Sequence, residues 1–231
     1  MTPKFTDSIN NNLRTIYLSR HGESLNNLFG KIGGDAELSE QGWKYAKALF
    51  SFVQSRPISS IWTSQLKRTQ QTTEYLDCPT TIEKGINEIN AGDHDSMTYE
   101  EIAETFPEEF AMRDKDKLSY RYPNGESYLD VLDRVEPVMK KMLQEDKLLV
   151  ISHQATLRCV LALLLGTELE ELPYMRVPLH TVIELRLSGG EVEVIYHRLK
   201  VDCVDTHRAK PDNCEINRNM TEACLTVPGH L

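Results

Sequence analysis

Long hydrophobic runs are absent from this sequence. The longest stretch of purely apolar residues, Cys159 to Leu165, has seven members, whereas a membrane-spanning helix needs about 20. The N-terminal residues MTPKFTDSINNN also lack the apolar centre of a secretory signal. These features predict a soluble protein located in the cytoplasm, with no membrane partner.

Cysteine, glycine and proline are scarce as well. The five cysteines are odd in number and form no CxxC pair, so we expect reduced thiols rather than a disulfide framework. The 12 glycines and 10 prolines among 231 residues, with 40% hydrophobic residues, exclude fibrous and low-complexity proteins. A chain of this length can bury a large core as one α/β domain or as two small ones.

The sequence has no excess of positive charge. Its 35 acidic residues outnumber 26 basic residues, which gives a formal net charge of −9 at pH 7. Because nucleic acids and anionic membranes select basic surfaces, this balance argues against both as partners. It leaves open a local site for an anionic small molecule.

Two apolar segments of high β propensity end at a histidine. Residues 15–18 form a short strand that runs into residues 20–23 (RHGE), and residues 148–152 form the strongest buried strand and stop at His153. Ligands of parallel sheets bind beyond the carboxyl ends of the strands. We therefore expect His21 and His153 at the same edge of a sheet.

Helices and further strands alternate along the chain. Apolar spacing and turn residues predict a helix capped by Ser39, helices at 65–75, 125–144 and 156–165, a strand at 60–63, and a hairpin formed by residues 181–187 and 192–199. Strands that alternate with helices indicate right-handed crossovers between parallel strands. The predicted fold class is α/β, a three-layer α/β/α sandwich with a mainly parallel central sheet.

We predict three regions in the chain. Residues 1–13 are polar and rich in asparagine, which indicates a flexible N-terminal segment. Residues 14–200 form the folded domain, and within it residues 85–124, with short helical patterns and many aromatic residues, form an inserted helical lid. Residues 201–231 show no periodicity and indicate an irregular C-terminal tail.

The residues after the first strand suit phosphate chemistry. Arg20 supplies a guanidinium for phosphate oxygens, and Gly22 lets the backbone approach a ligand closely. A neutral imidazole at His21 can attack phosphorus in line and carry the phosphoryl group as phosphohistidine. Because that group carries negative charge on its equatorial oxygens, further Arg and His residues must converge on the site.

An ordered series of motifs resembles one known family. Residues 18–24 (LSRHGES) are similar to the RHG signature of the histidine phosphatase superfamily, the phosphoglycerate mutase-like proteins. The chain from Arg14 to about Asn213 further resembles the bisphosphatase domain of the 6-phosphofructo-2-kinase/fructose-2,6-bisphosphatase family. The other segments that carry this resemblance are Asn27 with GKIGGD (30–35), WTSQLKRT (62–69), NEI (87–89), residues 107–114, YPNGESY (122–128), VISHQ (150–154) and THR (206–208).

The resemblance implies a histidine phosphatase fold with five catalytic residues. His21 is the expected nucleophile. Arg20, Arg68 and His153 are expected to bind the transferred phosphoryl group. Glu88 is expected to protonate the leaving sugar oxygen and then to help activate water. No metal ion or cofactor is implied, because arginine and histidine side chains neutralise the phosphoryl charge.

The resemblance also implies a set of substrate-binding residues. These are Asn27, Gly33, Tyr99, Arg113, Lys117, Tyr128, Gln154 and Arg158. Arg113 and Lys117 are four residues apart, so a helix would place both cations on one face. Together with Tyr99 they are expected to hold the phosphate group that is not removed.

The implied activity is hydrolysis of the 2-phosphate of β-D-fructose 2,6-bisphosphate. It yields fructose 6-phosphate and phosphate and thereby controls glycolysis and gluconeogenesis. The substrate is the expected partner, and a homodimer stays open. The bifunctional members of the family carry a kinase domain with a P-loop, whereas the GKI at residues 30–32 lacks the Ser or Thr of a Walker A motif. We therefore expect no kinase activity. Two origins of the chain stay open, a natural short form of the enzyme and an excised domain.

Two alternatives stay open at this point. A phosphoglycerate mutase or a broad sugar-phosphate phosphatase of the same fold would use the same nucleophile, but a mutase must protect its phosphohistidine from water. Arg113, Lys117 and the glycines at 33 and 34 favour a sugar bisphosphate. An inactive protein that binds a phosphorylated metabolite is the alternative from another class, and it is disfavoured because the family's catalytic positions are filled.

Overall fold

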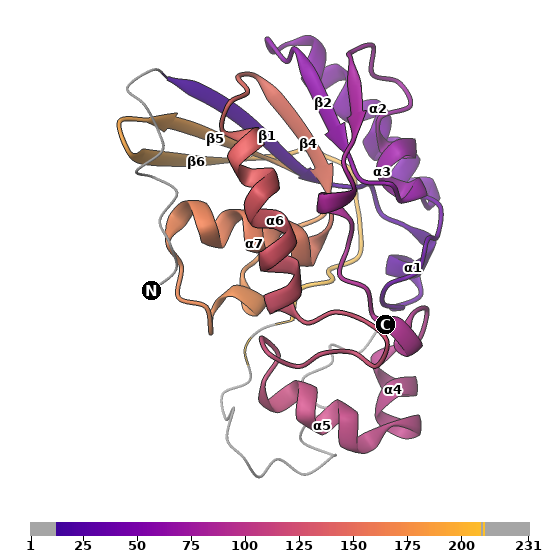
Figure 1. Cartoon of the computed structure of the whole chain (residues 1–231). Coiled ribbons are helices and arrows are strands. Elements are labelled where there is room, and N and C mark those ends of the chain that lie inside the picture. The colour runs from indigo at the N-terminus through magenta and orange to yellow at the C-terminus, as the bar shows by residue number, and fades with distance from the viewer. Residues whose placement is uncertain (1–12, 209, 211–231) are drawn as a thin grey trace.

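A six-stranded mixed sheet forms the centre of the fold (Figure 1). The computed structural model describes residues 13–208 and residue 210. The strands lie in the order β3-β2-β4-β1-β5-β6. Their bounds are β1 Arg14–Arg20, β2 Ser60–Thr63, β3 Thr80–Ile82, β4 Leu148–Ser152, β5 Thr181–Ser188 and β6 Glu191–Arg198.

The sheet is parallel on one side of β1 and antiparallel on the other. β1 pairs in parallel with β4, and β2 pairs in parallel with both β4 and β3. β5 pairs antiparallel with β1 and with β6. The turn between β5 and β6 holds Gly189 and Gly190, whose φ angles of 56° and 82° suit glycine. The predicted hairpin is confirmed, and the carboxyl ends of β1 and β4 lie side by side.

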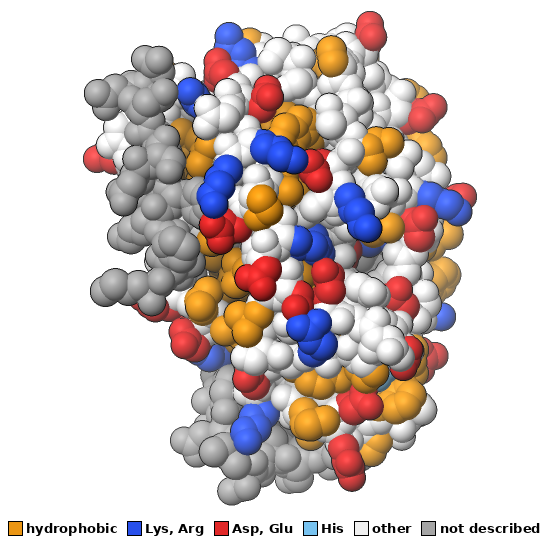
Figure 2. Space-filling model, in the orientation of Figure 1, with side chains coloured by type: hydrophobic (Ala, Val, Ile, Leu, Met, Phe, Trp, Pro, Cys, Tyr) orange, Lys and Arg blue, Asp and Glu red, His pale blue; other side chains and the backbone are white. Residues whose placement is uncertain are grey.

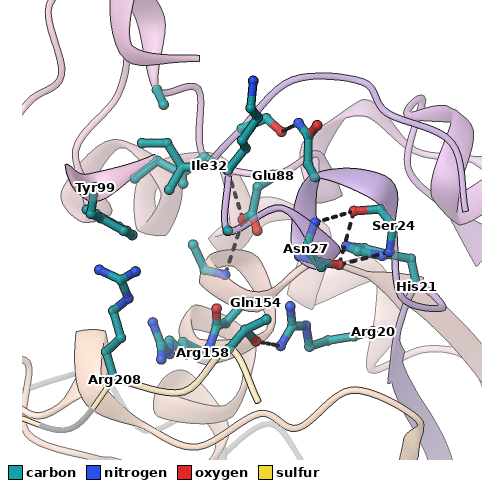
Figure 3. A pocket seen from close by; sticks show the side chains of 18 of the residues that line it. Arg20, His21, Ser24, Asn27, Ile32, Glu88, Tyr99, Gln154, Arg158 and Arg208 are labelled. Carbon is teal, nitrogen blue, oxygen red and sulfur yellow. Dashed lines mark hydrogen bonds between the residues drawn. The ribbon is translucent and has the colours of Figure 1, made fainter. Parts of the chain in front are cut away.

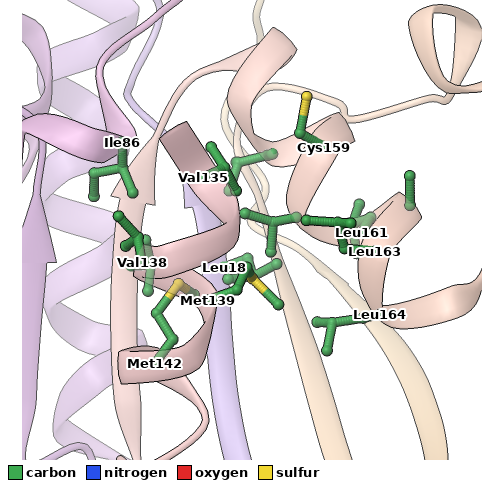
Figure 4. Close-up of a cluster of buried hydrophobic side chains, with 14 of the residues drawn as sticks. Leu18, Ile86, Val135, Val138, Met139, Met142, Cys159, Leu161, Leu163 and Leu164 are labelled. Carbon is green, nitrogen blue, oxygen red and sulfur yellow. The ribbon is translucent and has the colours of Figure 1, made fainter. Parts of the chain in front are cut away.

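Helices cover both faces of the sheet. Their bounds are α2 Glu40–Gln54, α3 Lys67–Thr72, α6 Tyr128–Met142 and α7 Gln154–Leu165. Leu18 of β1 packs with Met139 among α6 and α7 (Figure 4), whereas Tyr17 packs with Leu49 of α2 on the other face. Successive strand residues point to opposite faces. The predicted three-layer α/β/α sandwich is confirmed, and each buried aliphatic side chain contributes about 1.5–3 kcal/mol by leaving water.

Side-chain caps decide where the long helices begin. Ser39 accepts a hydrogen bond from the backbone N–H of Gly42 and caps α2, as predicted. Ser127 caps α6 through a capping box with Asp130, so this helix begins at Tyr128 rather than at 125. The helix predicted at 65–75 is shorter, because α3 spans only Lys67–Thr72.

A group of short helices lies beyond the carboxyl ends of the strands (Figure 1). Their bounds are α1 Leu25–Leu28, η2 Lys84–Ile86, η3 Gly92–His94, α4 Tyr99–Thr105, α5 Pro107–Lys115 and η4 Leu172–Tyr174. Ile102, Ala103 and Phe110 give α4 and α5 a small core of their own. Of these, η3, α4 and α5 lie within residues 85–124, where the sequence predicts a helical insertion.

Not all of the predicted regions fall within the described residues. The predicted flexible segment lies outside them up to residue 12, as do residue 209 and the tail from 211 to 231. Residues 201–208 contain neither helix nor strand. Within the described part of the chain, no helix is long and apolar enough to cross a membrane.

Candidate active site

A cleft opens beyond the carboxyl ends of β1 and β4, next to the short helices (Figure 3). It is lined by all the predicted site residues except His153: Arg20, His21, Asn27, Gly33, Arg68, Glu88, Tyr99, Arg113, Lys117, Tyr128, Gln154 and Arg158. These residues come from β1, α1, α3, α4, α5, α6, α7 and the intervening loops. The fold therefore gathers residues that are far apart in the sequence.

Positive charge is concentrated in this cleft. Seven basic residues line it: Arg20, Lys31, Arg68, Arg113, Lys117, Arg158 and Arg208. Among the residues that the structure describes, the acidic side chains that line it with them are Glu88 and Asp205. On the outer face shown in Figure 2, acidic and basic side chains are interspersed. A protein with a net charge of −9 thus holds a local site for an anion.

His21 is held by the backbone at the end of β1. Its N–H donates to the Ser152 carbonyl of β4 at 3.0 Å, and its ring Nδ1 donates to the Gly22 carbonyl at 2.7 Å. Because a carbonyl only accepts, Nδ1 carries the proton and Nε2 keeps a lone pair, which accepts from Arg68 Nε at 3.1 Å. Burial and the charges of Arg68 and Arg20 hold the pKa of His21 well below its usual range. The imidazole is therefore neutral at neutral pH.

The loop after His21 touches the neighbouring helices through its backbone. A Cβ on Gly22 would lie 2.6 Å from the Gly42 carbonyl of α2, and a Cβ on Gly42 would lie 2.1 Å from the Glu23 carbonyl. The Gly22 N–H donates to Thr72 Oγ1 of α3 at 2.9 Å. Only glycine allows this close approach, which fixes the nucleophile loop against the α2 layer.

His153 stands beside His21 without lining the cleft itself. The two ring centroids are 5.1 Å apart. The Nε2 of His153 is hydrogen-bonded to Ser64 Oγ at 2.7 Å, while its buried Nδ1 has no partner among the described residues. Burial and the nearby charge of Arg68 hold the pKa of His153 well below its usual range. A second neutral imidazole therefore has one ring nitrogen uncommitted next to His21.

Two buried arginines bring positive charge to the same point. Arg20 Nη1 donates to the Val177 carbonyl at 3.1 Å and to Thr206 Oγ1 at 2.8 Å, whereas its buried Nε has no partner in the described structure. Arg68 Nη1 donates to the Gly34 carbonyl at 2.7 Å. Burial lowers the pKa of Arg20 to about 10, so it stays charged at neutral pH. These unpaired cations are suited to a phosphoryl group.

Glu88 lies across the cleft on a tightly held loop. Its Oε1 accepts from the backbone N–H of Ile89 at 3.0 Å and of Ala155 at 3.1 Å. Arg134 donates to the carbonyls of Gly85 and Glu88 at 2.8 and 3.1 Å. The first turn of α7 and the side chain of Arg134 thus fix a carboxyl group that faces the site.

Smaller groups shape the middle of the cleft. Asn27 Oδ1 accepts from both the N–H and the hydroxyl of Ser24 at 3.1 Å, which orients this amide. Gly33 has a φ of 59°, and a Cβ there would collide with Asp95 Oδ1 at 1.8 Å. Gln154 is the first residue of α7 and lines the wall near Glu88 (Figure 3).

The far end of the cleft combines cations with tyrosines. Arg113 donates to the hydroxyls of Tyr99 and Tyr122 at 2.8 and 2.7 Å. Arg158 Nη1 donates to the Tyr128 hydroxyl at 2.9 Å. These phenol partners neutralise no charge, so the guanidinium groups keep their positive charge for a ligand.

Lys117 reaches this end by a different route from the predicted one. Arg113 and Lys117 were expected to share a helix face, but α5 ends at Lys115, so that expectation is wrong. Lys117 Nζ donates to the Pro173 carbonyl of η4 at 3.0 Å. Burial and the nearby charges of Arg158 and Arg113 hold its pKa well below its usual range. Both residues nevertheless line the cleft.

Three further lining residues have no role predicted from the sequence. Asp205, Thr206 and Arg208 reach the cleft from the region predicted to be an irregular tail. Thr206 and Arg208 belong to the THR segment that resembles the family, which was a usable signal. Their position depends on a long-range path of the chain that local patterns do not reveal.

The fold, the paired histidines and the cationic cleft agree with the sequence comparison. The chain belongs to the histidine phosphatase superfamily (branch 1), whose sequence profile matches residues 16–200.

More specific relatives are bifunctional proteins. The chain is 53% identical over 221 residues to "6-phosphofructo-2-kinase/fructose-2,6-bisphosphatase" of Gallus gallus, which covers 94% of this chain and 47% of that protein. It is 50% identical over 221 residues to "6-phosphofructo-2-kinase/fructose-2,6-bisphosphatase 4" of Homo sapiens, with 94% and 47% coverage. The chain thus spans about half the length of the curated relatives it matches.

Solved structures share the fold at low identity. The α-ribazole phosphatase of Shigella flexneri superposes with a TM-score of 0.73 at 22% identity, covering 83% of this chain and 100% of that one. A mycobacterial glucosyl-3-phosphoglycerate phosphatase superposes with a TM-score of 0.68 at 19% identity, with 83% and 100% coverage. These likenesses establish the architecture alone.

Proposed function

We propose that the chain hydrolyses the 2-phosphate of β-D-fructose 2,6-bisphosphate to give fructose 6-phosphate and inorganic phosphate. Two properties support this proposal. The relatives that match 94% of the chain carry the name fructose-2,6-bisphosphatase. The cleft has cations at both ends, around His21 and around Tyr99, as a substrate with two phosphate groups requires.

In the first step, the lone pair of His21 Nε2 attacks the phosphorus of the 2-phosphate. The N–P bond forms while the bond between phosphorus and the sugar oxygen breaks. Glu88, in its carboxylic acid form, donates a proton to that oxygen so that it leaves as a hydroxyl. Arg20, Arg68 and His153 stabilise the charge on the equatorial oxygens.

In the second step, water attacks the phosphohistidine and the N–P bond breaks. The Glu88 carboxylate accepts the proton of the attacking water, which restores the acid for the next cycle. Nε2 regains its lone pair, and inorganic phosphate leaves. Because side-chain cations supply the positive charge throughout, the proposed reaction requires no metal ion.

The observation that carries the proposal is the state of the His21 ring. Its Nδ1 proton is engaged by the Gly22 carbonyl, so the nucleophilic nitrogen is the one next to Arg68. A histidine in the opposite tautomer, or one protonated at neutral pH, would have no lone pair on Nε2. The environment of β1 thus prepares the ring for attack before substrate arrives.

A labelling experiment tests this step. Brief incubation with bisphosphate labelled at its 2-phosphate should give a labelled protein whose label is lost in acid and kept in base. His21→Ala should remove the label while it retains the circular dichroism spectrum and binds fructose 6-phosphate. Label that persists in this folded variant would place the nucleophile elsewhere.

The same proposal places the protein in its cellular setting. We infer a cytoplasmic enzyme that lowers the concentration of fructose 2,6-bisphosphate and so regulates glycolysis. The proposal concerns the bisphosphatase reaction, not the kinase reaction named for the relatives. The homodimer stays a prediction, which sedimentation of the purified chain tests.

A further inference from the structure

A segment beyond the superfamily match completes the cleft. The matched region ends at residue 200. Residues 201–208, here named the C-terminal strap, follow β6 and run back past the sheet toward the short helices (Figure 1). Asp205, Thr206 and Arg208 of this strap line the cleft.

The C-terminal strap is fastened to the loop that carries the nucleophile. The backbone N–H of Val204 donates to Glu23 Oε2 at 2.8 Å, and the other oxygen of this buried carboxylate accepts from Ser39 Oγ at 2.5 Å. Thr206 Oγ1 accepts from Arg20 at 2.8 Å. Two contacts therefore set where the end of the strap lies relative to the catalytic residues.

The last cleft-lining residue of the strap faces the end opposite to His21. The Arg208 guanidinium carbon lies 3.5 Å from the centroid of the Tyr99 ring (Figure 3). The hydroxyl of that ring accepts from Arg113, so one tyrosine connects two guanidinium groups. A planar guanidinium stacked on an aromatic face is held with its N–H edge available to a ligand.

Among the described residues, Arg208 forms no ion pair, and its nearest acidic influence is Glu100. Burial lowers the pKa of Arg208; Tyr99 and Glu100 oppose this shift in part, and the nearby charge of Arg113 adds to it. In the part of the chain that the structure describes, no carboxylate lies within ion-pair distance of either guanidinium. Gathering like charges without a counterion costs free energy, which a bound anion recovers. This arrangement calls for an anionic ligand.

We propose that Arg208 binds the phosphate group that the reaction leaves in place, so that the C-terminal strap is a specificity element added to the superfamily domain. This inference rests on the proposed function. Arg208, Arg113 and Lys117 all line this cleft, so three side chains with N–H donors are available to the oxygens of a phosphate group. The strap thereby selects substrates that carry a second phosphate.

The test compares two substrates of one enzyme. Fructose 2,6-bisphosphate carries the second phosphate, whereas p-nitrophenyl phosphate lacks it. Arg208→Ala should raise KM for the bisphosphate and the Kd of fructose 6-phosphate by about ten- to a hundredfold, the range of one charge-assisted contact. The kcat/KM for p-nitrophenyl phosphate should stay within about twofold. Arg208→Lys, which keeps the charge but loses the planar fork, should recover part of the loss.

A matched control removes an arginine elsewhere. Arg186 lies on β5, outside the cleft, where it pairs with Glu184 and Glu193. Arg186→Ala changes the net charge equally and should leave KM for both substrates unchanged. An equal change of KM in the two variants would reduce the effect to long-range charge and overturn the inference.

The remaining outcomes separate this inference from the proposed function. An equal loss on both substrates in Arg208→Ala would show that the residue only holds the reacting end, and unchanged binding of fructose 6-phosphate would show that it contacts no retained phosphate. Either result overturns the inference alone. A wild-type chain that releases no phosphate from the bisphosphate would overturn the proposed function and the inference with it.

Discussion

The two ends of the cleft are built differently. At the reacting end, His21 and His153 follow directly on buried parallel strands, and backbone hydrogen bonds between β1 and β4 set their positions. At the far end, Tyr99 and Arg113 stand on short helices with a small core of three buried residues, and Arg208 stands on a segment without secondary structure. The two histidines are placed by the main sheet, whereas Tyr99, Arg113 and Arg208 are placed by side-chain contacts outside it.

This difference indicates that the reacting end carries out catalysis while the far end selects the substrate. Groups on the sheet are held by the largest core of the molecule, so their geometry changes little when a surface loop changes. Groups on short helices and straps can be replaced without rebuilding the sheet. We therefore expect substitutions at the reacting end to lower kcat and substitutions at the far end to raise KM.

The largest expected effect tests the reacting end at Glu88. A sugar oxygen leaves poorly without a proton, whereas nitrophenolate leaves well, so Glu88→Gln should slow phosphorylation of His21 by the bisphosphate about 10²- to 10⁴-fold and by p-nitrophenyl phosphate far less. Single-turnover kinetics isolate this step from hydrolysis of the phosphoenzyme. Equal slowing with both substrates would mean that Glu88 only shapes the cleft.

A smaller effect is expected at the far end. Arg113→Ala removes a guanidinium that two tyrosine hydroxyls orient, and loss of this contact should raise KM for the bisphosphate about ten- to a hundredfold with a smaller change in kcat. Steady-state kinetics measure kcat and KM of this variant, with Arg186→Ala as the matched control. If kcat falls while KM stays constant, the hypothesis that the far end serves binding rather than catalysis is wrong.

The smallest effect concerns stability against pH. Burial and neighbouring cations hold the pKa values of His21 and His153 well below the usual histidine value, which is about 6.5 when unfolded. As the pH falls below this value, His21 and His153 become protonated in the unfolded chain but stay neutral in the folded chain. Stability should therefore be full above about pH 6.5 and fall below it, by up to about 1.4 kcal/mol per pH unit for each histidine.

Urea unfolding between pH 7.5 and 5.5 measures that slope. His153→Asn should show a shallower fall in the free energy of unfolding than the wild type, whatever its stability at neutral pH. Parallel curves for the two proteins would show that His153 takes up a proton in the folded state. The reacting end would then be less sealed from solvent than its burial implies.

Sequence patterns predict the reacting end better than the far end. The strands before His21 and His153 are each a run of apolar residues with high β propensity. Their burial can therefore be predicted from composition alone. The hairpin follows from alternation around Gly189 and Gly190. These features depend on neighbours in the sequence, which a single chain displays.

Other features depend on partners that a local pattern does not show. The edge strand β3 has three exposed residues, so no hydrophobic signal marks it. The end of α5 before Lys117 depends on the non-helical backbone of Asp116, with a φ of −139°. Arg208 reaches Tyr99 only because the C-terminal strap is tied to Glu23 and Arg20, contacts between distant parts of the chain.

The pairing of β1 with β4 has a consequence for how activity arises during folding. Arg20 stands opposite Ser152, so the two histidines, each one residue further, come side by side. A slip of one residue would turn every side chain of β4 to the opposite face, and the pair would be lost together with the core. Joining strands so distant along the chain is a slow step. The rate at which phosphatase activity returns after refolding should thus report the rate at which β4 pairs with β1 in the correct register.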